Sequence, residues 1–135
     1  MNNSDKRLLF IVDDNVSYAN MAGVYLSSNL PGIETKIFTT GEACLHAMNL
    51  NPFAVVLDYF LNTKFESAWN GIEVLKKILA DYPTSNVIVI SAQESMELAL
   101  NCMNSGAIDY VIKNEKAMPE ISKILLNLMD DEVEY

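Results

Sequence analysis

The chain has 135 residues, a length that suits a single domain with its own core. Its 9 lysines and arginines against 18 aspartates and glutamates give a formal net charge of −9, and such a field repels phosphate backbones. No apolar run reaches membrane-spanning length, and the first, Leu8–Val12, is too short for a signal peptide. We therefore expect a cytoplasmic protein that binds no nucleic acid directly and inserts into no membrane.

Five runs of strand length follow one another along the chain. One of them, Ile33–Phe38, alternates between apolar and polar residues, which predicts an edge strand with one wetter face. The others are continuous and rich in β-branched or aromatic residues, a pattern typical of strands buried on both faces of a parallel sheet. These four runs are Leu8–Val12, Phe53–Leu57, Val87–Ile90 and Tyr110–Ile112.

Apolar residues at helical spacing lie between and after these runs. Helix breakers end three of the stripes, at Pro31-Gly32, Pro83 and Gly106, and Gly41–Leu50 can hold a further helix. Residues 130–135 form an acidic tail that we expect to fray. The four stripes run through Ala19, Gly23, Leu26 and Leu30, through Ile72, Leu75 and Leu79, through Met96, Ala99 and Met103, and through Ile121, Ile124 and Leu128.

Five strands that alternate with five helices predict a doubly wound α/β fold around a parallel sheet. We expect one domain over residues 1–135, with a core at about residues 7–129. In such folds, ligands bind beyond the carboxyl ends of the strands. The residues that follow each strand are therefore the first candidates for a functional site.

Charged and hydroxyl side chains stand at those strand ends. Asp13 and Asp14 follow the first strand, Asp58 the third, Ser91 the fourth and Lys113 the fifth. Three carboxylates on one rim repel one another unless a cation joins them, and oxygen ligands without histidine or cysteine suit Mg²⁺. A carboxylate is also a competent nucleophile for phosphoryl transfer, with Lys113 available to offset charge and Ser91 to donate a hydrogen bond.

Four short motifs contain these residues. They are F-I-V-D-D-N at Phe10–Asn15, V-L-D at Val56–Asp58, I-S-A at Ile90–Ala92 and D-Y-V-I-K at Asp109–Lys113. In this order, each at a strand end, they resemble the receiver domain of two-component response regulators. The resemblance extends from about Arg7 to Met129. It implies a flavodoxin-like (βα)5 fold whose five parallel strands take the order 2-1-3-4-5.

The resemblance implies a magnesium site that accepts a phosphoryl group. Asp58 matches the phosphoacceptor. Asp14 matches the direct Mg²⁺ ligand of the acidic pair, and Asp13 matches the ligand that acts through water. Phe60, two residues after the acceptor, would offer its backbone carbonyl to the metal.

Further roles follow from the same resemblance. Lys113 matches the phosphate-binding lysine. Ser91 and Tyr110 match a switch pair, in which the hydroxyl moves onto the phosphate and the aromatic ring turns inward. The implied chain is a phosphoacceptor rather than an enzyme, although it would assist its own Mg²⁺-dependent phosphorylation and dephosphorylation.

The implied partners are proteins. A sensor histidine kinase or a histidine phosphotransfer protein would donate the phosphoryl group, and a downstream protein would bind the face of the fourth helix, fifth strand and fifth helix. A phosphorylation-dependent homodimer is left open. Because the chain ends after the fifth helix, we expect a stand-alone regulator that signals through a partner protein.

Two departures from the family pattern concern loops beside the site. Asn114 stands where the family usually has a proline after the lysine, so the path of the loop before the fifth helix is open. Gly71 lies thirteen residues after the acceptor, and Thr63–Asn70 therefore looks like an insertion of about five residues. We expect Phe65 and Trp69 to anchor this insertion, because each carries a large apolar surface.

Simpler interpretations stay open for single residues. Asp13 and Asp14 can cap the first helix, Ser91 with Glu94 can form a capping box, and Tyr110 can be a core residue.

Three other functions also stay open: a phosphatase with an aspartyl nucleophile, a flavodoxin-like cofactor binder, and a receiver that only binds partners. The acids are adjacent rather than spaced as D-x-D, and no phosphate-cradling loop follows the first strand, which disfavours the first two.

Overall fold

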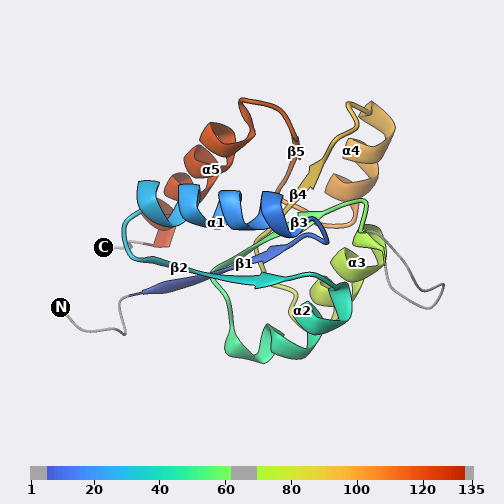
Figure 1. The fold of residues 1–135 in the computed structure, drawn as a ribbon. Helices are drawn as coiled ribbons and strands as arrows, with labels where there is room; N and C mark the ends of the chain where they lie inside the picture. Colours follow the sequence, from blue (N-terminus) through green and yellow to red (C-terminus); the bar gives the residue numbers. More distant parts are fainter. Residues whose placement is uncertain (1–5, 62–69, 133–135) are drawn as a thin grey trace.

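The computed structural model describes residues 6–61 and 70–132 of the chain. Strands and helices alternate, as the apolar runs and stripes predict (Figure 1). A short 3₁₀ segment, η2 at Met48–Leu50, continues the second helix. The other elements are β1 (Arg7–Val12), α1 (Val16–Asn29), β2 (Ile33–Phe38), α2 (Gly41–Ala47), β3 (Ala54–Asp58), α3 (Gly71–Asp81), β4 (Val87–Ser91), α4 (Met96–Asn104), β5 (Asp109–Ile112) and α5 (Ala117–Glu132).

The five strands pair in parallel in the order β2-β1-β3-β4-β5, which confirms the predicted fold class and strand order. Figure 1 shows α1 and α5 on one side of the sheet and α2 and α3 on the other. Successive residues of β1 face these sides in turn: Leu9 and Ile11 pack with α1 and α5, whereas Phe10 and Val12 pack with α2, α3 and α4. Cores on both faces explain why the central strands are continuous apolar runs.

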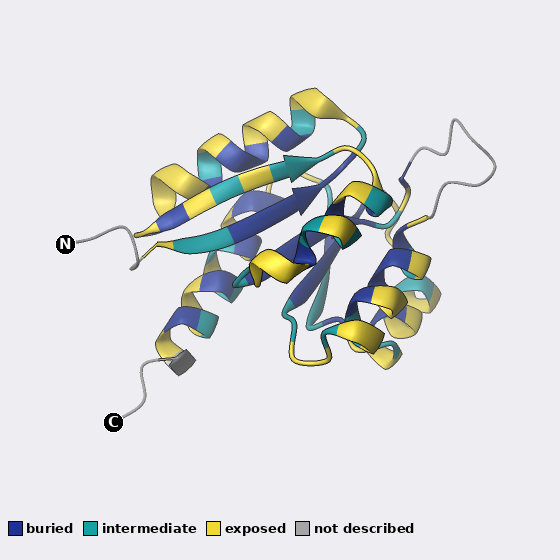
Figure 2. Cartoon of the chain, turned by 90° about the horizontal axis from the view of Figure 1, so that it is seen from below, coloured by how far each residue is buried: buried dark blue, intermediate teal, exposed yellow. Residues whose placement is uncertain are grey.

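The two edge strands differ from the central ones. In β2, Ile33 is buried while Glu34 and Lys36 are exposed, which confirms the predicted edge strand (Figure 2). The prediction that Tyr110–Ile112 is buried on both faces is wrong, because the strand order places β5 at the other edge. Within β5, only Val111 is buried.

The last helix is longer than the sequence predicts. α5 continues to Glu132 and so includes the first residues of the segment that we expect to fray. Leu125 and Met129 are buried, and these contacts hold the helix on the core almost to its end. None of the helices in residues 6–61 and 70–132 is long and apolar enough to cross a membrane.

The structure describes one of the two loops that depart from the family pattern and only the end of the other. No peptide bond in the described ranges is cis, so Asn114 follows Lys113 through a trans bond. Most of the predicted insertion Thr63–Asn70, with Phe65 and Trp69, lies outside the described residues. Its last residue, Asn70, caps α3 and forms a capping box with Glu73, the third residue of that helix.

Candidate functional site

The carboxyl ends of β1, β3, β4 and β5 bring the predicted site residues to one rim of the sheet. Asp13 follows β1, Asp58 ends β3, Ser91 ends β4 and Lys113 follows β5. The backbone N–H of Lys113 donates to the Ser91 carbonyl at 2.8 Å, and this bond fixes the ends of β4 and β5 side by side. The sequence therefore located the rim correctly, because parallel strands end at the same edge.

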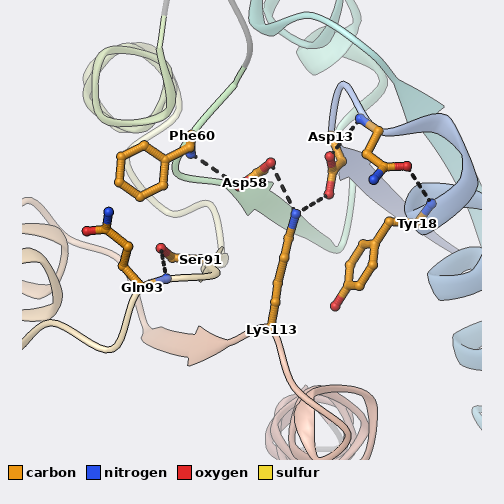
Figure 3. Close-up of polar contacts among 8 residues, drawn as sticks. Asp13, Tyr18, Asp58, Phe60, Ser91, Gln93 and Lys113 are labelled. Carbon is orange, nitrogen blue, oxygen red and sulfur yellow. Dashed lines mark hydrogen bonds and ion pairs between the residues drawn. The ribbon is translucent and has the colours of Figure 1, made fainter.

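Lys113 reaches across this rim and joins two of the carboxylates (Figure 3). Its Nζ lies 2.8 Å from Oδ2 of Asp13 and 3.2 Å from Oδ2 of Asp58. The two aspartates are 0% and 4% exposed, and the lysine side chain is 17% exposed. Buried charges need partners, so the three side chains form one electrostatic unit.

The unit shifts the pKa of two of its members. Burial and the charge of Asp13 raise the pKa of Asp58 to about 6, although Lys113 and the Phe60 N–H lower it. That N–H donates to Oδ1 of Asp58 at 3.1 Å. Burial alone would lower the pKa of Lys113, but the hydrogen bond to Asp13 and the charges of Asp58 and Asp13 together raise it. At neutral pH the lysine is charged and Asp58 is mostly ionised.

The same rim fits a hard cation. One carboxylate oxygen each from Asp13, Asp14 and Asp58 lies within 4.8 Å of the others, and an all-oxygen donor set suits Mg²⁺. Asp13 uses Oδ1 for the Asn15 N–H at 2.9 Å and Oδ2 for Lys113. No hydrogen bond within the described residues engages the Asp14 carboxylate. This difference favours Asp14 over Asp13 as a direct ligand.

Ser91 and Tyr110 meet at one residue of the loop before α4. The buried Ser91 hydroxyl accepts a hydrogen bond from the Gln93 N–H at 3.1 Å. The Tyr110 hydroxyl donates to the Gln93 carbonyl at 2.7 Å. The sequence carries no signal for Gln93, because both contacts use its backbone. The arrangement links the ends of β4 and β5 to the start of α4.

Two capping interpretations from the sequence are wrong. Asn15, rather than the acidic pair, caps α1 by accepting from the Tyr18 N–H at 3.1 Å. Ser95, rather than Ser91, caps α4 by accepting from the Leu98 N–H at 3.2 Å. Capping therefore explains neither the acidic pair nor Ser91.

Tyr18 is a member of the site that the sequence does not single out. Its ring centroid lies 4.5 Å from Nζ of Lys113, which is within cation–π range. The sequence signal is limited to its place in the first turn of α1. Its contact with Lys113 could not be foreseen from that place, because the lysine follows β5, at the far end of the chain.

Known proteins are similar to this chain in sequence. A family model for the response regulator receiver domain matches residues 9–125. The chain is 33% identical over 106 residues to an NtrX-like response regulator of Rickettsia conorii, and 28% identical over 130 residues to the DNA-binding response regulator MtrA of Mycolicibacterium smegmatis. These matches cover 78% and 96% of this chain but 21% and 54% of the relatives, so the chain spans about a fifth and about half of their lengths.

Solved structures show the same fold. The receiver domain of NtrX from Brucella abortus matches with a TM-score of 0.79 and 26% identity, over 90% of this chain and 98% of that one. A Francisella receiver domain matches with a TM-score of 0.80 over 94% of this chain and 99% of that one, and its 23% identity supports the fold alone. The family match covers most of the chain and fits the observed sheet and aspartate rim. This chain therefore belongs to the response regulator receiver domain family.

Proposed function

We propose that this receiver domain accepts a phosphoryl group on Asp58 and then changes the surface that it offers to a partner protein. Receiver domains are signalling phosphoacceptors rather than classical enzymes. The observation that carries the proposal is the surroundings of Asp58: a buried carboxylate with the Lys113 Nζ at 3.2 Å and the Phe60 N–H at 3.1 Å. Stability alone does not favour two buried carboxylates that share one ammonium, with a third carboxylate beside them.

The contacts of Asp58 suit transfer from a phosphohistidine. An O–P bond forms at the carboxylate while the N–P bond breaks, and the imidazole leaves with that electron pair. The Phe60 N–H holds Oδ1 and orients the carboxylate, and Lys113 offsets charge on the phosphoryl oxygens. Through these contacts, the chain would assist its own phosphorylation and dephosphorylation.

The family uses Mg²⁺ at its acidic pocket. We propose that Asp14 and Asp58 ligate this ion directly, together with the Phe60 carbonyl, and that Asp13 does so through water. When bound, Mg²⁺ supplies positive charge that offsets the carboxylates and the phosphoryl oxygens. Lys113 pairs with Asp13 and Asp58, and no hydrogen bond within the described residues engages the Asp14 carboxylate, so the three carboxylates can accept a second cation.

The switch would begin at Ser91. A phosphoryl oxygen on Asp58 is a stronger acceptor than a neutral partner, and it would draw the Ser91 hydroxyl toward it and away from the Gln93 N–H. The Tyr110 hydroxyl holds the carbonyl of the same Gln93, so its ring would move with this loop. The charge change at Asp58 would thereby reach α4 and β5.

The downstream partner would bind the face made by α4, β5 and α5. On α4, Met96 is 77% exposed, and Leu100 and Met103 are also exposed. Apolar side chains that gather on one helix suit a protein partner. We propose further that a histidine kinase or a histidine phosphotransfer protein donates the phosphoryl group. We also propose that the protein is cytoplasmic and that phosphorylation promotes a homodimer.

Labelling with a small phosphodonor tests the proposal. The protein is incubated with acetyl phosphate and Mg²⁺, and the acyl phosphate is mapped by mass spectrometry. Asp58→Asn should abolish labelling. Asp81→Asn is the matched control, because Asp81 is a surface residue in an ion pair with Lys77, and it should label as the wild type does. Undiminished labelling of Asp58→Asn would contradict the proposal.

A further inference from the structure

A closed circuit of contacts runs from Asp13 through the first turn of α1 to Lys113 and back (Figure 3). Oδ1 of Asp13 accepts from the Asn15 N–H at 2.9 Å, and Oδ1 of Asn15 accepts from the Tyr18 N–H at 3.1 Å. The Tyr18 ring lies 4.5 Å from Nζ of Lys113, and this Nζ donates to Oδ2 of Asp13 at 2.8 Å. The start of α1 thus places an anion and an aromatic face around one ammonium.

We propose that Tyr18 is a positioning residue, whose ring face holds Lys113 where it meets the incoming phosphoryl group. The inference rests on the proposed function of Asp58. A lysine head on a flexible four-carbon stem loses rotamer freedom when it is held in one place. The ring attracts the ammonium electrostatically and restricts it before the reaction begins, so less ordering is left for the transition state.

The geometry also predicts the direction of the effect. Lys113 already lies 3.2 Å from Oδ2 of Asp58, so a phosphoryl oxygen on Asp58 comes within its reach without a large movement away from the ring. Tyr18 is half-buried against the core under α1 and α5, and its ring keeps water from one side of the ammonium. Exclusion of water strengthens the attraction between the ammonium and the phosphoryl oxygens. Loss of the ring should therefore slow phosphorylation.

Rates of phosphorylation by acetyl phosphate test this role. Tyr18→Leu keeps an apolar side chain against the core but removes the ring, and it should slow labelling about two- to fivefold. Tyr18→Phe keeps the ring and should label at the wild-type rate. Tyr25→Leu is the matched control, because Tyr25 lies two turns along the same helix and packs against the same core. It should leave the rate unchanged.

A double-mutant cycle separates positioning from general damage to the site. In a Lys113→Met background, Tyr18→Leu should change the rate less than in the wild-type background, whereas a merely structural role would slow both equally. A second readout needs no phosphorylation. The ring current of Tyr18 should shift the Hε proton resonances of Lys113 in the wild type and in Tyr18→Phe, and this shift should be lost in Tyr18→Leu.

The outcomes distinguish this inference from the proposed function. If the wild type labels at Asp58 but Tyr18→Leu is as fast, or slows both backgrounds equally, the positioning role is overturned and the function of Asp58 stands. If the wild type does not label, both are overturned. Tyr18→Met, which is also apolar and lacks a ring, replaces Tyr18→Leu should that variant not fold, and it carries the same expectations.

Discussion

Asp58 faces a charged network on one side and neutral groups on the other. On the charged side, Lys113 joins it to the buried Asp13 through ion pairs of 3.2 and 2.8 Å. On the neutral side, Ser91 and Tyr110 each make one hydrogen bond to the backbone of the loop before α4. Both sides end at the same rim, yet different interactions hold them.

The difference separates chemistry from movement. Breaking a buried ion pair leaves an uncompensated charge and is costly, so the charged side should keep its geometry while the reaction proceeds. A neutral hydrogen bond contributes only about 1 kcal/mol net, so the neutral side can rearrange for a modest cost. The exposed apolar residues of α4 lie beyond the neutral side, where a rearrangement would change the surface.

The largest expected effect comes from removing the ammonium of the charged side. Lys113→Met should lower the free energy of unfolding by about 3 kcal/mol in metal-free buffer at neutral pH, because two buried carboxylates lose their counter-charge. Urea denaturation measures this loss. Lys77→Met removes a surface lysine paired with Asp81 at 3.2 Å and should cost less than about 1 kcal/mol. Equal losses in the two variants would show that the site pair is no stronger than a surface pair.

Asp58→Asn should act in the opposite direction and stabilise the metal-free protein by about 2 kcal/mol at neutral pH. The pKa of Asp58 is raised from 3.8 to about 6 in the folded protein, so the folded state holds this proton more tightly than the unfolded state does. The contribution of Asp58 to stability is therefore fully present below about pH 4 and is lost as the pH rises through about 6.

Urea denaturation in chelator at about pH 4 and about pH 7 checks this sign. The free energy of unfolding of Asp58→Asn should exceed that of the wild type by more at about pH 7 than at about pH 4. Asp81→Asn, on the surface of α3, should show no such growth. A variant that is less stable than the wild type at neutral pH would mean that the ion pair with Lys113 outweighs the burial of Asp58.

The third prediction concerns Phe60, which is 45% exposed and whose N–H donates to Asp58. This bulky apolar residue lies two positions after Asp58, the proposed phosphoacceptor, and we expect it to shield the acyl phosphate from attacking water. Phe60→Asn should speed loss of the phosphoryl group by a factor on the order of ten, because an in-line water gains access and a polar partner. A dephosphorylation time course measures the rate. Phe60→Leu keeps an apolar group and should decay nearly as slowly as the wild type; identical decay of all three proteins would contradict the shielding.

The smallest expected effect is on the neutral side. Tyr110→Phe removes the hydrogen bond of 2.7 Å to the Gln93 carbonyl and should cost about 1 kcal/mol or less. Amide exchange should speed up in the loop before α4 while the charged side stays protected. Tyr82→Phe, in a tyrosine that packs against the same core cluster, should leave exchange in that loop unchanged. Faster exchange at Asp13 in Tyr110→Phe would contradict the separation of the two sides.

Much of the candidate site could be predicted from strand ends alone. Asp13, Asp58, Ser91 and Lys113 each follow or end an apolar run, and a parallel sheet must bring such ends to one rim. The capping residues were missed because a cap depends on backbone angles at a single residue, which composition does not specify. Asn15 was therefore overlooked beside the acidic pair.

The sequence by itself determined the α/β class, the strand order implied by its family motifs, and the charged rim, because the spacing of apolar residues sets each element and parallel strands share a carboxyl edge. Only the tertiary structure decided how little of β5 is buried, that Tyr18 lies over Lys113 and that Tyr110 binds the Gln93 carbonyl. These features arise from contacts between segments far apart in the chain, and no local pattern records which residues will meet.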